Sequence, residues 1–482
     1  MKRFYLFLIV SVLFSTQLFS QKALPPQPVY PVPTKQQLQW HKMEMYAFIH
    51  FTTNTFTDKE WGYGDESTDI FNPTELDANQ WAKTLKETGF KAIILTAKHH
   101  DGFTLWPSKY TAHSVKNSPY KNGKGDVVKE TSEAAGKYGL KFGIYLSPWD
   151  RNHADYGTPA YITYYRNQLK ELFINYGTVF EMWFDGANGG DGYYGGKRTS
   201  VKINGATYYD WPGTLELVRK MQPQVLFFSD AGPDIRWVGN EKGLAGITNW
   251  NTITPDTLYA GKPGINDLLN TGSINGSKWI PAEVDVSIRP GWFYHAKEDK
   301  KVKTPEQLFD IYLTSVGRGS NLLLNIPPDR RGLFHENDVA SLKEFKKLLD
   351  ERLSHNLALK AKVKASNTRG NNKLFSGKNI TDNNKNTYWA TDDNVVSASA
   401  EIELKKRFPI NYVLLQEYIA LGQRVKSFAV DVWQNNQWKE AATGTTIGYK
   451  RIIKIEPTVT NKIRVRILDA KASPLISNIT VY

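Results

Sequence analysis

The chain has 482 residues, too many for one ordinary domain and enough for a barrel enzyme followed by a smaller module. Its 61 Lys and Arg against 48 Asp and Glu give a formal net charge of +13, but the basic residues are scattered and form no nucleic-acid-binding motif. We therefore expect a basic solvated surface and no nucleic-acid partner, whereas the 13% aromatic content is compatible with binding sugars, whose C–H faces pack on aromatic rings.

The first twenty residues form a separate segment, MKRFYLFLIVSVLFSTQLFS. Lys2 and Arg3 precede an apolar run from Phe4 to Phe14, and Ser20 offers a small residue for cleavage. We interpret residues 1–20 as a signal peptide and expect a periplasmic or extracellular protein without stable membrane insertion after processing; the alternative is a retained anchor. Because the chain has no cysteine, its stability must come from a large core rather than from disulfides.

Residues 21–356 alternate short apolar runs with longer helical patterns, as in repeated β–α units. This alternation predicts a (β/α)8-like barrel with irregular sixth and seventh units. The predicted strands are Met45–Phe51, Ala92–Ala97, Phe142–Ser147, Val179–Phe184, Val225–Ser229, Gly246–Asn249, Trp279–Val284 and Asn321–Ile326. The predicted helices include Asp77–Thr88, Tyr161–Tyr176, Trp211–Met221, Pro305–Val316 and Glu336–Leu353.

Residues 357–482 have a different pattern, with short segments of period two that predict an all-β domain, a β-sandwich. All nine histidines of the chain lie at or before His355, so this domain supplies no histidine to catalysis. Its expected role is structural or sugar-binding. Trp389 and Trp438 are either core residues, which we favour, or sugar platforms.

Polar and aromatic residues gather where the predicted barrel strands end. In a barrel these ends meet at one mouth, where catalytic side chains of this fold lie. The residues are His50, Lys98, His99, His100, Asp101, Trp149, Asp150, Trp183, Asp185, Asp230 and Glu283. Their coincidence at the strand ends indicates an active site.

Asp185 follows the apolar run EMWF and precedes Gly186 and Ala187, which leave room for a ligand. On its own it would be interpreted as a helix cap. Hydrolysis of a glycosidic bond with retention, however, needs two carboxyl groups: one attacks the sugar, and the other donates a proton and then activates water. With a second acid nearby, Asp185 becomes the candidate nucleophile.

Several later residues are candidates for that second acid, and the sequence alone leaves the choice open. Glu241 lies between Gly239 and Gly243 in a predicted flexible loop, which suits an acid that changes its protonation state. Glu283 lies within a predicted strand, which suits a fixed contact to substrate. The remaining candidates are Asp230, Asp234 and Asp285.

The adjacent pair His99 and His100 has three interpretations: metal ligands, neutral partners of sugar hydroxyls, or structural residues. Because neighbouring side chains on an extended backbone point in opposite directions, we expect the pair to bind no metal together. We favour the role of neutral partners.

Eight stretches resemble the α-L-fucosidases of glycoside hydrolase family 29: FIHF, KEWGYGDE, TAKHHDGFTLWPS, GIYLSPWDR, EMWFDGA, IRWVGNEKG, SIRPGWFYH and NLLLNIPPDRRG. The resemblance implies a barrel domain, hydrolysis with retention and no cofactor requirement. It implies Asp185 as the nucleophile. It also implies a fucose pocket formed by His50, Glu60, Trp61, His99, His100, Trp183 and Trp292.

The stretch WVGNE is similar to that of the subgroup selective for α-1,3/1,4-linked fucose, which implies Glu241 as acid/base and fucosylated glycans as substrates. Residues 357–482 resemble galactose-binding-like jelly rolls of the discoidin or family 32 carbohydrate-binding type. Their loop offers Asp382 and backbone carbonyls to a structural calcium ion. The alternatives are another retaining exo-glycosidase, such as an α-galactosidase, and a non-catalytic carbohydrate-binding protein.

Overall fold

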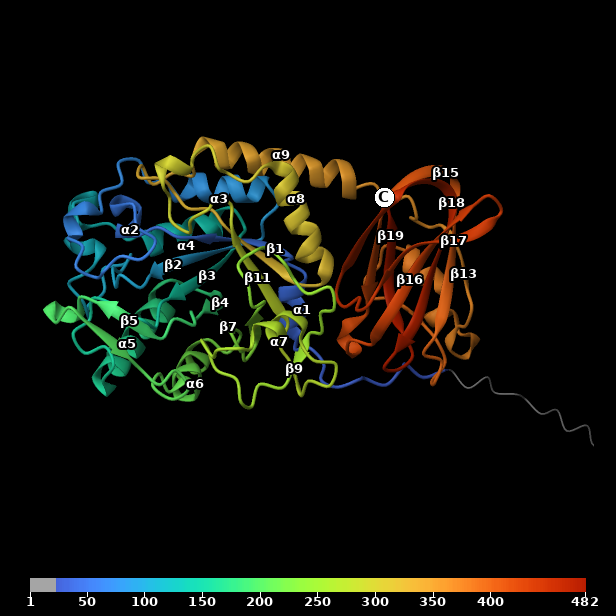
Figure 1. Cartoon of the computed structure of the whole chain (residues 1–482), viewed down its shortest axis with the longest axis horizontal. Helices are drawn as coiled ribbons and strands as arrows, with labels where there is room; N and C mark the ends of the chain where they lie inside the picture. Colours follow the sequence, from blue (N-terminus) through green and yellow to red (C-terminus); the bar gives the residue numbers. More distant parts are fainter. Residues whose placement is uncertain (1–22) are drawn as a thin grey trace, which may run out of the picture.

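The computed structural model describes residues 23–482, so the predicted signal peptide lies outside the described residues. The chain forms two domains side by side, a barrel surrounded by helices and a β-sandwich (Figure 1). The long helix α9 (Glu336–Leu353) runs along the barrel toward the sandwich. No helix in residues 23–482 is long and apolar enough to span a bilayer.

The catalytic-domain prediction of a (β/α)8-like barrel is confirmed. Eight parallel strands close into a ring in the order β1-β12-β11-β8-β7-β4-β3-β2. They are β1 (Met45–Ile49), β2 (Ala92–Lys98), β3 (Lys141–Leu146), β4 (Val179–Trp183), β7 (Leu226–Ser229), β8 (Ile235–Trp237), β11 (Ala282–Ser287) and β12 (Asn321–Asn325). Most of these strands are buried along their whole length, which explains their continuous apolar runs.

Helices cover the outside of this barrel. They are α1 (Lys35–His41), α2 (Thr53–Thr57), α3 (Ala78–Glu87), α4 (Val127–Lys137), α5 (Pro159–Asn175), α6 (Trp211–Met221), α7 (Asn266–Thr271), α8 (Pro305–Thr314) and α9. Local sequence fixes several starts: Thr304 and Gln307 form a capping box at α8, which has Pro305 at its first position. Two small antiparallel pairs lie in the loops, β5 (Gly189–Gly192) with β6 (Thr199–Lys202) and β9 (Thr252–Ile253) with β10 (Lys278–Trp279).

The sixth strand differs from the prediction. We expected Gly246–Asn249, but the strand is β8, Ile235–Trp237, which pairs with β7 after a connection of only five residues. The chain therefore passes from β7 to the neighbouring parallel strand β8 without a helix between the two strands. The prediction was wrong because β8 is three residues long and has a charged centre: Arg236 is buried outside the ring and donates to the carbonyls of Leu269, Ile280 and Trp250.

The seventh strand is also shifted. It is β11, Ala282–Ser287, rather than Trp279–Val284, because Lys278–Trp279 belongs to the separate pair β9–β10. Glu283 therefore lies near the start of its strand, below the mouth of the barrel, and not at the strand end where the prediction placed it.

The second domain is the predicted β-sandwich. Its strands are β13 (Lys362–Ala365), β14 (Trp389–Ala390), β15 (Ala398–Glu417), β16 (Val425–Gln434), β17 (Gln437–Gly444), β18 (Arg451–Ala470) and β19 (Leu475–Val481). β15 and β18 are long strands with irregular register, which the sequence pattern had split into shorter segments. Such irregularities bend a strand and let it serve both layers of a sandwich.

The two tryptophans of the sandwich have different environments. Trp389 is fully buried and donates its indole N–H to the carbonyl of Asn367 at 2.8 Å, which confirms the core interpretation. Trp438 is not a core residue: it is partly exposed on β17 and packs edge-on against its cross-strand partner Trp433, with the guanidinium of Arg464 over its ring. Trp438 thus stabilises the β16–β17 hairpin from outside the core.

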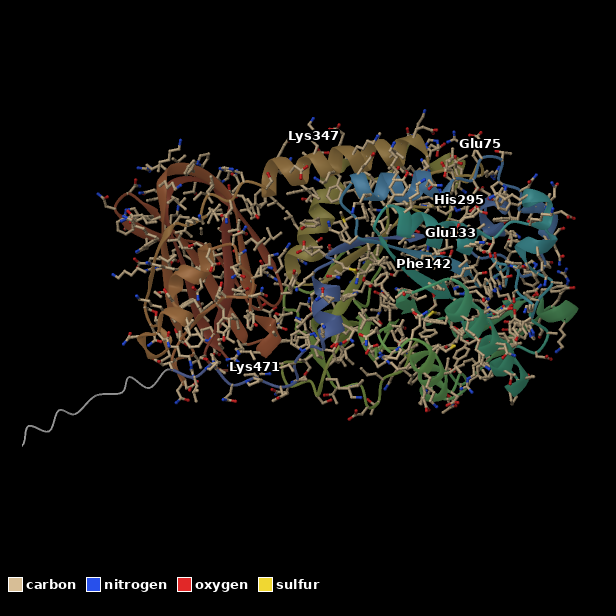
Figure 2. The ribbon with its side chains drawn as sticks, turned by 180° about the vertical axis from the view of Figure 1, so that it is seen from behind. Glu75, Glu133, Phe142, His295, Lys347 and Lys471 are labelled. Atoms are coloured by element: carbon tan, nitrogen blue, oxygen red, sulfur yellow. The ribbon has the colours of Figure 1, made fainter. Side chains whose placement is uncertain are left out.

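The sandwich is hydrogen-bonded to the irregular part of the barrel. The buried Gln423 side chain donates to the carbonyl of Asn249 at 2.9 Å and accepts from the backbone N–H of Asn251 at 2.8 Å. Lys471, at the side of the sandwich that faces the barrel (Figure 2), donates to the carbonyl of Ile274 at 2.7 Å. These bonds hold Asn249, Asn251 and Ile274 in place, in the loops on either side of the short helix α7.

Candidate active site

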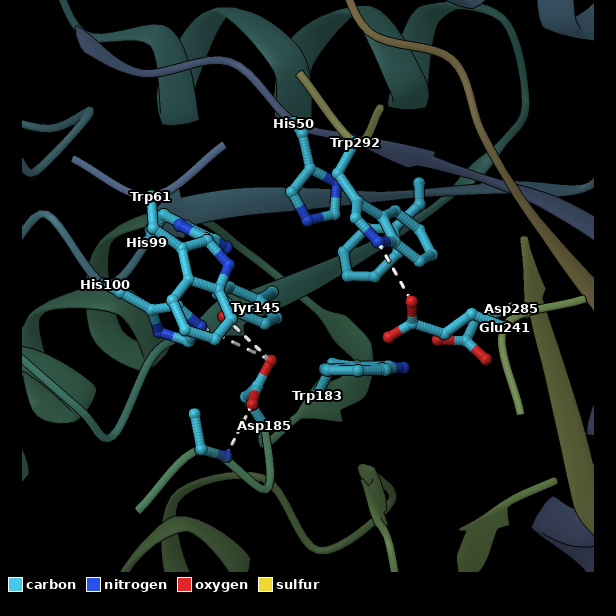
Figure 3. Close-up of a pocket in the computed structure, with 12 residues that line it drawn as sticks. His50, Trp61, His99, His100, Tyr145, Trp183, Asp185, Glu241, Asp285 and Trp292 are labelled. Atoms are coloured by element: carbon cyan, nitrogen blue, oxygen red, sulfur yellow. Dashed lines mark hydrogen bonds and ion pairs between the residues drawn. The ribbon is translucent and has the colours of Figure 1, made fainter. Parts of the chain in front are cut away.

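One pocket of about 270 Å³ opens at the C-terminal ends of the barrel strands (Figure 3). It is slightly smaller than the roughly 300–1,000 Å³ typical of sites for drug-sized molecules, so it suits one sugar ring better than a long glycan. Its lining consists of Phe48, His50, Trp61, His99, His100, Tyr145, Trp183, Asp185, Ala187, Glu241, Asp285 and Trp292. Most of the predicted site residues therefore lie together.

Asp185 follows β4 directly and is held from two sides. One carboxylate oxygen accepts the backbone N–H of Ala187 at 2.6 Å, and the other accepts the hydroxyl of Tyr145 at 3.1 Å. A quarter of its side chain is exposed, toward the pocket. Burial raises the pKa of Asp185, and these two hydrogen bonds oppose the rise by favouring the ionised form. A fixed, accessible carboxylate at this position can attack a bound sugar.

Three buried histidines line the pocket, and Nε2 of His100 lies 4.0 Å from a carboxylate oxygen of Asp185. Burial lowers the pKa of His50 and His100 to about 3 and that of His99 well below its ordinary value. His50 is oriented by the side chain of Asn325 at 2.8 Å, and His100 by the hydroxyl of Ser147 at 2.7 Å. Neutral imidazoles offer both a donor and an acceptor, which suits sugar hydroxyls.

The expectation that His99 and His100 point in opposite directions was wrong. The chain turns after Lys98, and both rings face the pocket with their centroids 4.1 Å apart. In residues 23–482, no three His, Cys, Asp or Glu side chains form a cluster that could hold a metal ion.

Glu241 lies on the loop after β8, across the pocket from Asp185 (Figure 3). Its side chain is exposed and accepts one hydrogen bond, from the indole N–H of Trp292 at 3.3 Å. Partial burial raises the pKa of Glu241, Trp292 lowers it, and the charges of Asp185 and Glu60 raise it further. A raised pKa and access to solvent are what a proton-exchanging acid requires.

Asp285 is a third carboxyl group in the lining. It is only 3% exposed and accepts the indole N–H of Trp237 at 2.8 Å. Burial, followed by the charge of Glu241, raises the pKa of Asp285 well above its usual range. Burial therefore favours the neutral form of Asp285, which can donate a hydrogen bond toward the pocket.

Two predicted binding residues, Glu60 and Glu283, are absent from the pocket lining. Glu60 instead accepts hydrogen bonds from the backbone N–H groups of Trp292 and Phe293 and from Nε2 of His295. These bonds tie the loop after β11 to the loop after β1. Glu283 is fully buried beneath the pocket and accepts the indole N–H of Trp183. Both support residues of the lining.

The remaining acid candidates have structural partners. Asp234 pairs with Arg219 and accepts the backbone N–H of Phe227, away from the pocket. Asp230 accepts the backbone N–H of Gly261, and burial raises its pKa to about 7. Asp230 therefore links two loops beside Asp185 without lining the pocket.

The sequence prediction missed Phe48 and Tyr145, which also line the pocket. Both lie inside strands rather than at their ends, on the inward-facing side. The alternation of side chains along a strand could have identified them: Phe48 is two residues before His50, and Tyr145 is two residues before Ser147.

Comparison with known proteins agrees with this geometry. Residues 28–352 match the family model for α-L-fucosidase. The chain belongs to the α-L-fucosidase family. Residues 362–480 match the F5/8 type C domain, which is the discoidin-type domain that the sequence resembles.

The relatives extend over nearly the whole α-L-fucosidase chain. It is 41% identical to α-L-fucosidase 1 of Arabidopsis thaliana over 99% of this chain and 93% of that protein. A glycoside hydrolase 29 family member from an unknown rumen bacterium is 45% identical, with a TM-score of 0.85 over 95% of this chain and 78% of that one. A Ruminococcus gnavus GH29 fucosidase in complex with fucose is 34% identical, with a TM-score of 0.86 over 96% of each chain. These matches exclude the alternatives of an α-galactosidase and of a non-catalytic binding protein.

Proposed function

We propose that this α-L-fucosidase removes terminal α-1,3/1,4-linked fucose from glycans by double displacement, with Asp185 as nucleophile and Glu241 as general acid/base. The observation that carries the proposal is the pairing of two unlike carboxyl groups in one pocket: Asp185 is fixed by two hydrogen bonds, and Glu241 lies on an exposed loop. Retention needs this division of roles.

In the first step, Asp185 attacks the anomeric carbon while Glu241 donates its proton to the departing glycosidic oxygen. The ionised Asp185 is supported by the hydroxyl of Tyr145 and the amide of Ala187. In the second step, Glu241 removes a proton from water, which displaces Asp185 from the sugar. Because Glu241 is exposed, it can exchange its proton with solvent between steps.

Glu241 is a better acid/base than the other two acids near this side of the pocket. Glu283 is fully buried, and Asp285 is 3% exposed with a pKa raised well above its usual range. A buried carboxyl group exchanges its proton with solvent less readily than the exposed Glu241 does. Asp285 is better suited to donating a hydrogen bond to Glu241 or to the glycan.

Fucose itself is held by neutral and aromatic groups. His50, His99 and His100 bind hydroxyls, while the rings of Trp183 and Trp292 pack on the apolar C–H faces of the sugar. Trp61, which is 55% exposed at the mouth, contacts the next sugar of the glycan. The α-1,3/1,4 preference rests on the resemblance of the WVGNE stretch.

We propose that catalysis needs no cofactor, since both displacements use carboxyl groups and water. A structural calcium ion in the sandwich loop stays a proposal. Asp382 accepts the backbone N–H of Asn384 and the hydroxyl of Thr387, each at 2.7 Å, and each of its oxygens keeps a lone pair that could face an ion. Export to the periplasm or beyond is proposed from residues 1–20.

The assay that tests this function compares release of fucose from a Lewis-type trisaccharide, from an α-1,2-fucosylated lactose and from p-nitrophenyl α-L-fucoside. We expect rapid release from the trisaccharide and little from the α-1,2 linkage. Equal rates on both glycans would contradict the linkage preference while leaving the fucosidase activity intact.

A further inference from the structure

A pair of buried carboxyl groups lies beneath the pocket, inside the barrel. Glu181 on β4 and Glu283 on β11 are both 0% exposed. Across the described residues 23–482, no Lys, Arg or His side chain forms a salt bridge with either of them. Their neighbours are neutral donors, namely the hydroxyl of Tyr46 and the indole N–H groups of Trp40 and Trp183.

Without a cation, the pair holds a proton between its members, since two buried carboxylates side by side would repel strongly. Burial, the charge of Glu283 and a hydrogen bond to it raise the pKa of Glu181 well above its ordinary value. Burial raises the pKa of Glu283 as well, while hydrogen bonds from Glu181, Tyr46 and Trp183 act in the opposite direction. The shared proton belongs to the pair, and burial favours at most one negative charge on the two groups.

One member of the pair, Glu283, contacts the wall of the active site. Glu283 Oε1 accepts the indole N–H of Trp183 at 2.9 Å. The Trp183 ring stacks on Phe228 with a centroid distance of 4.1 Å and an interplanar angle of 9°, and it also contacts Phe48 at 5.1 Å and Tyr145 at 5.3 Å. Trp183 precedes Asp185 by two residues on the same strand end. Stacking fixes the plane of the ring, and the N–H bond fixes its rotation within that plane.

We propose that Glu283 is a positioning residue for the fucose site, which accepts the Trp183 N–H and, with Glu181 and Tyr46 as its own donors, fixes the ring against which the sugar packs. This inference rests on the proposed function, because it assigns Trp183 to sugar binding. It also excludes Glu283 as the acid/base, since its oxygens are turned to Trp183 and Tyr46.

The test is a double-mutant cycle with Glu283→Leu, Trp183→Phe and the double variant, measured on aryl α-L-fucosides whose leaving groups differ in pKa. Glu283→Leu removes the acceptor and Trp183→Phe removes the donor. We expect each to weaken inhibition by free fucose and to lower kcat/KM about tenfold, by the same factor for every leaving group. The double variant should be no worse than the poorer single variant.

Two outcomes would overturn the inference. If the single effects multiply in the double variant, Glu283 does not act through Trp183. If the loss of kcat/KM caused by Glu283→Leu grows as the leaving group becomes more basic, Glu283 transfers a proton during catalysis. Failure of the proposed function would be visible separately, as an active Asp185→Ala enzyme, and the Glu283–Trp183 coupling would still be measurable from fucose binding alone.

Two isosteric variants complete the experiment. Glu283→Gln keeps an oxygen for the Trp183 N–H and is expected to bind fucose within about threefold of wild type, so it carries the test even if Glu283→Leu does not fold.

Glu417→Gln is the matched control: this buried glutamate of the sandwich accepts three backbone N–H groups, from Arg424, Val425 and Gly448. It should lower the unfolding temperature without changing fucose binding. Weakened fucose binding in Glu283→Gln but not in Trp183→Phe would contradict the role assigned to Glu283.

Discussion

Asp185 and Glu241, two of the three carboxyl groups of the pocket, lie in halves of the barrel that are built differently. Asp185 follows β4 in the half where strands alternate with full helices, and two hydrogen bonds hold its carboxylate. Glu241 follows the three-residue strand β8 in the irregular half, where no helix joins β7 to β8 and only the short helix α7 lies between β8 and β11, and one hydrogen bond of 3.3 Å orients it. The difference matches the proposed roles: a nucleophile must be held in place, whereas an acid/base must exchange its proton with solvent.

The largest expected loss of activity follows a substitution in the regular half, at Asp185. Asp185→Ala removes the nucleophile, so we expect kcat/KM to fall by at least about 10³-fold for aryl fucosides and glycans alike. Steady-state rates on both substrate classes check this. Substantial activity of the variant on either class would show that another group attacks the sugar.

A substitution of Glu241, in the irregular half, should slow hydrolysis of one class of substrate far more than that of the other. Glu241→Ala is expected to reduce hydrolysis of natural glycans by about 10²–10⁴-fold, because their leaving alcohol needs a proton, and to spare aryl fucosides with acidic phenols. The ratio of the two rates measures the selectivity. If Asp285→Asn shows this pattern and Glu241→Ala does not, the acid role belongs to Asp285.

The pH dependence of the rate should also distinguish the contribution of Asp185 from that of Glu241. The proposed mechanism requires Asp185 ionised and Glu241 protonated, so the rate is expected to rise with pH through the pKa of Asp185 and to fall through that of Glu241. Both pKa values are raised by burial, which shifts the whole profile upward. Glu241→Gln should abolish the alkaline fall in kcat/KM for an activated aryl fucoside and leave the acid limb unchanged. An unchanged alkaline limb would indicate that another group provides the proton.

A smaller effect is expected at the domain interface, which fixes the irregular half. Gln423→Ala leaves the backbone N–H of Asn251 without its partner, at a cost of about 1–3 kcal/mol in stability. Because residues 247–251 follow the Glu241 loop, the remaining activity should fall more for glycans than for activated aryl fucosides.

The matched control for this interface variant is Asn478→Ala, a buried residue bonded to Gln416 and Thr480 within the sandwich. It should reduce the unfolding temperature comparably and leave the ratio of glycan to aryl rates unchanged. Equal ratios in both variants would mean that the sandwich stabilises the protein without influencing the acid loop.

The regular half was also the easier half to predict from sequence. Apolar runs and caps located β1 to β4 within two residues, and α6 and α9 have the predicted bounds. β8 was missed because its signal is three residues around the charged Arg236, whose buried partners are backbone carbonyls distant in sequence.

Residues that lie within two positions of a predicted strand end, such as His50 and Asp185, were predicted from the pattern, whereas Glu241 was chosen from the family resemblance because β8 was missed. The position of Glu283 depended on where β11 begins, a register that local pattern does not determine. The orientation of His99 and His100 depended on the turn from His99 to Gly102; the pair Asp101-Gly102 marks a turn but does not determine where the two rings point. Both require the folded chain.

The most direct test of the account is to trap the covalent intermediate. Incubation with 2-deoxy-2-fluoro-α-L-fucosyl fluoride, proteolysis and peptide mass spectrometry would locate the sugar on the chain, since a fluorine at C2 slows the second displacement. The account predicts one fluorofucosyl group esterified to Asp185. A label on Asp230, Glu241 or Asp285 would contradict the assignment of the nucleophile.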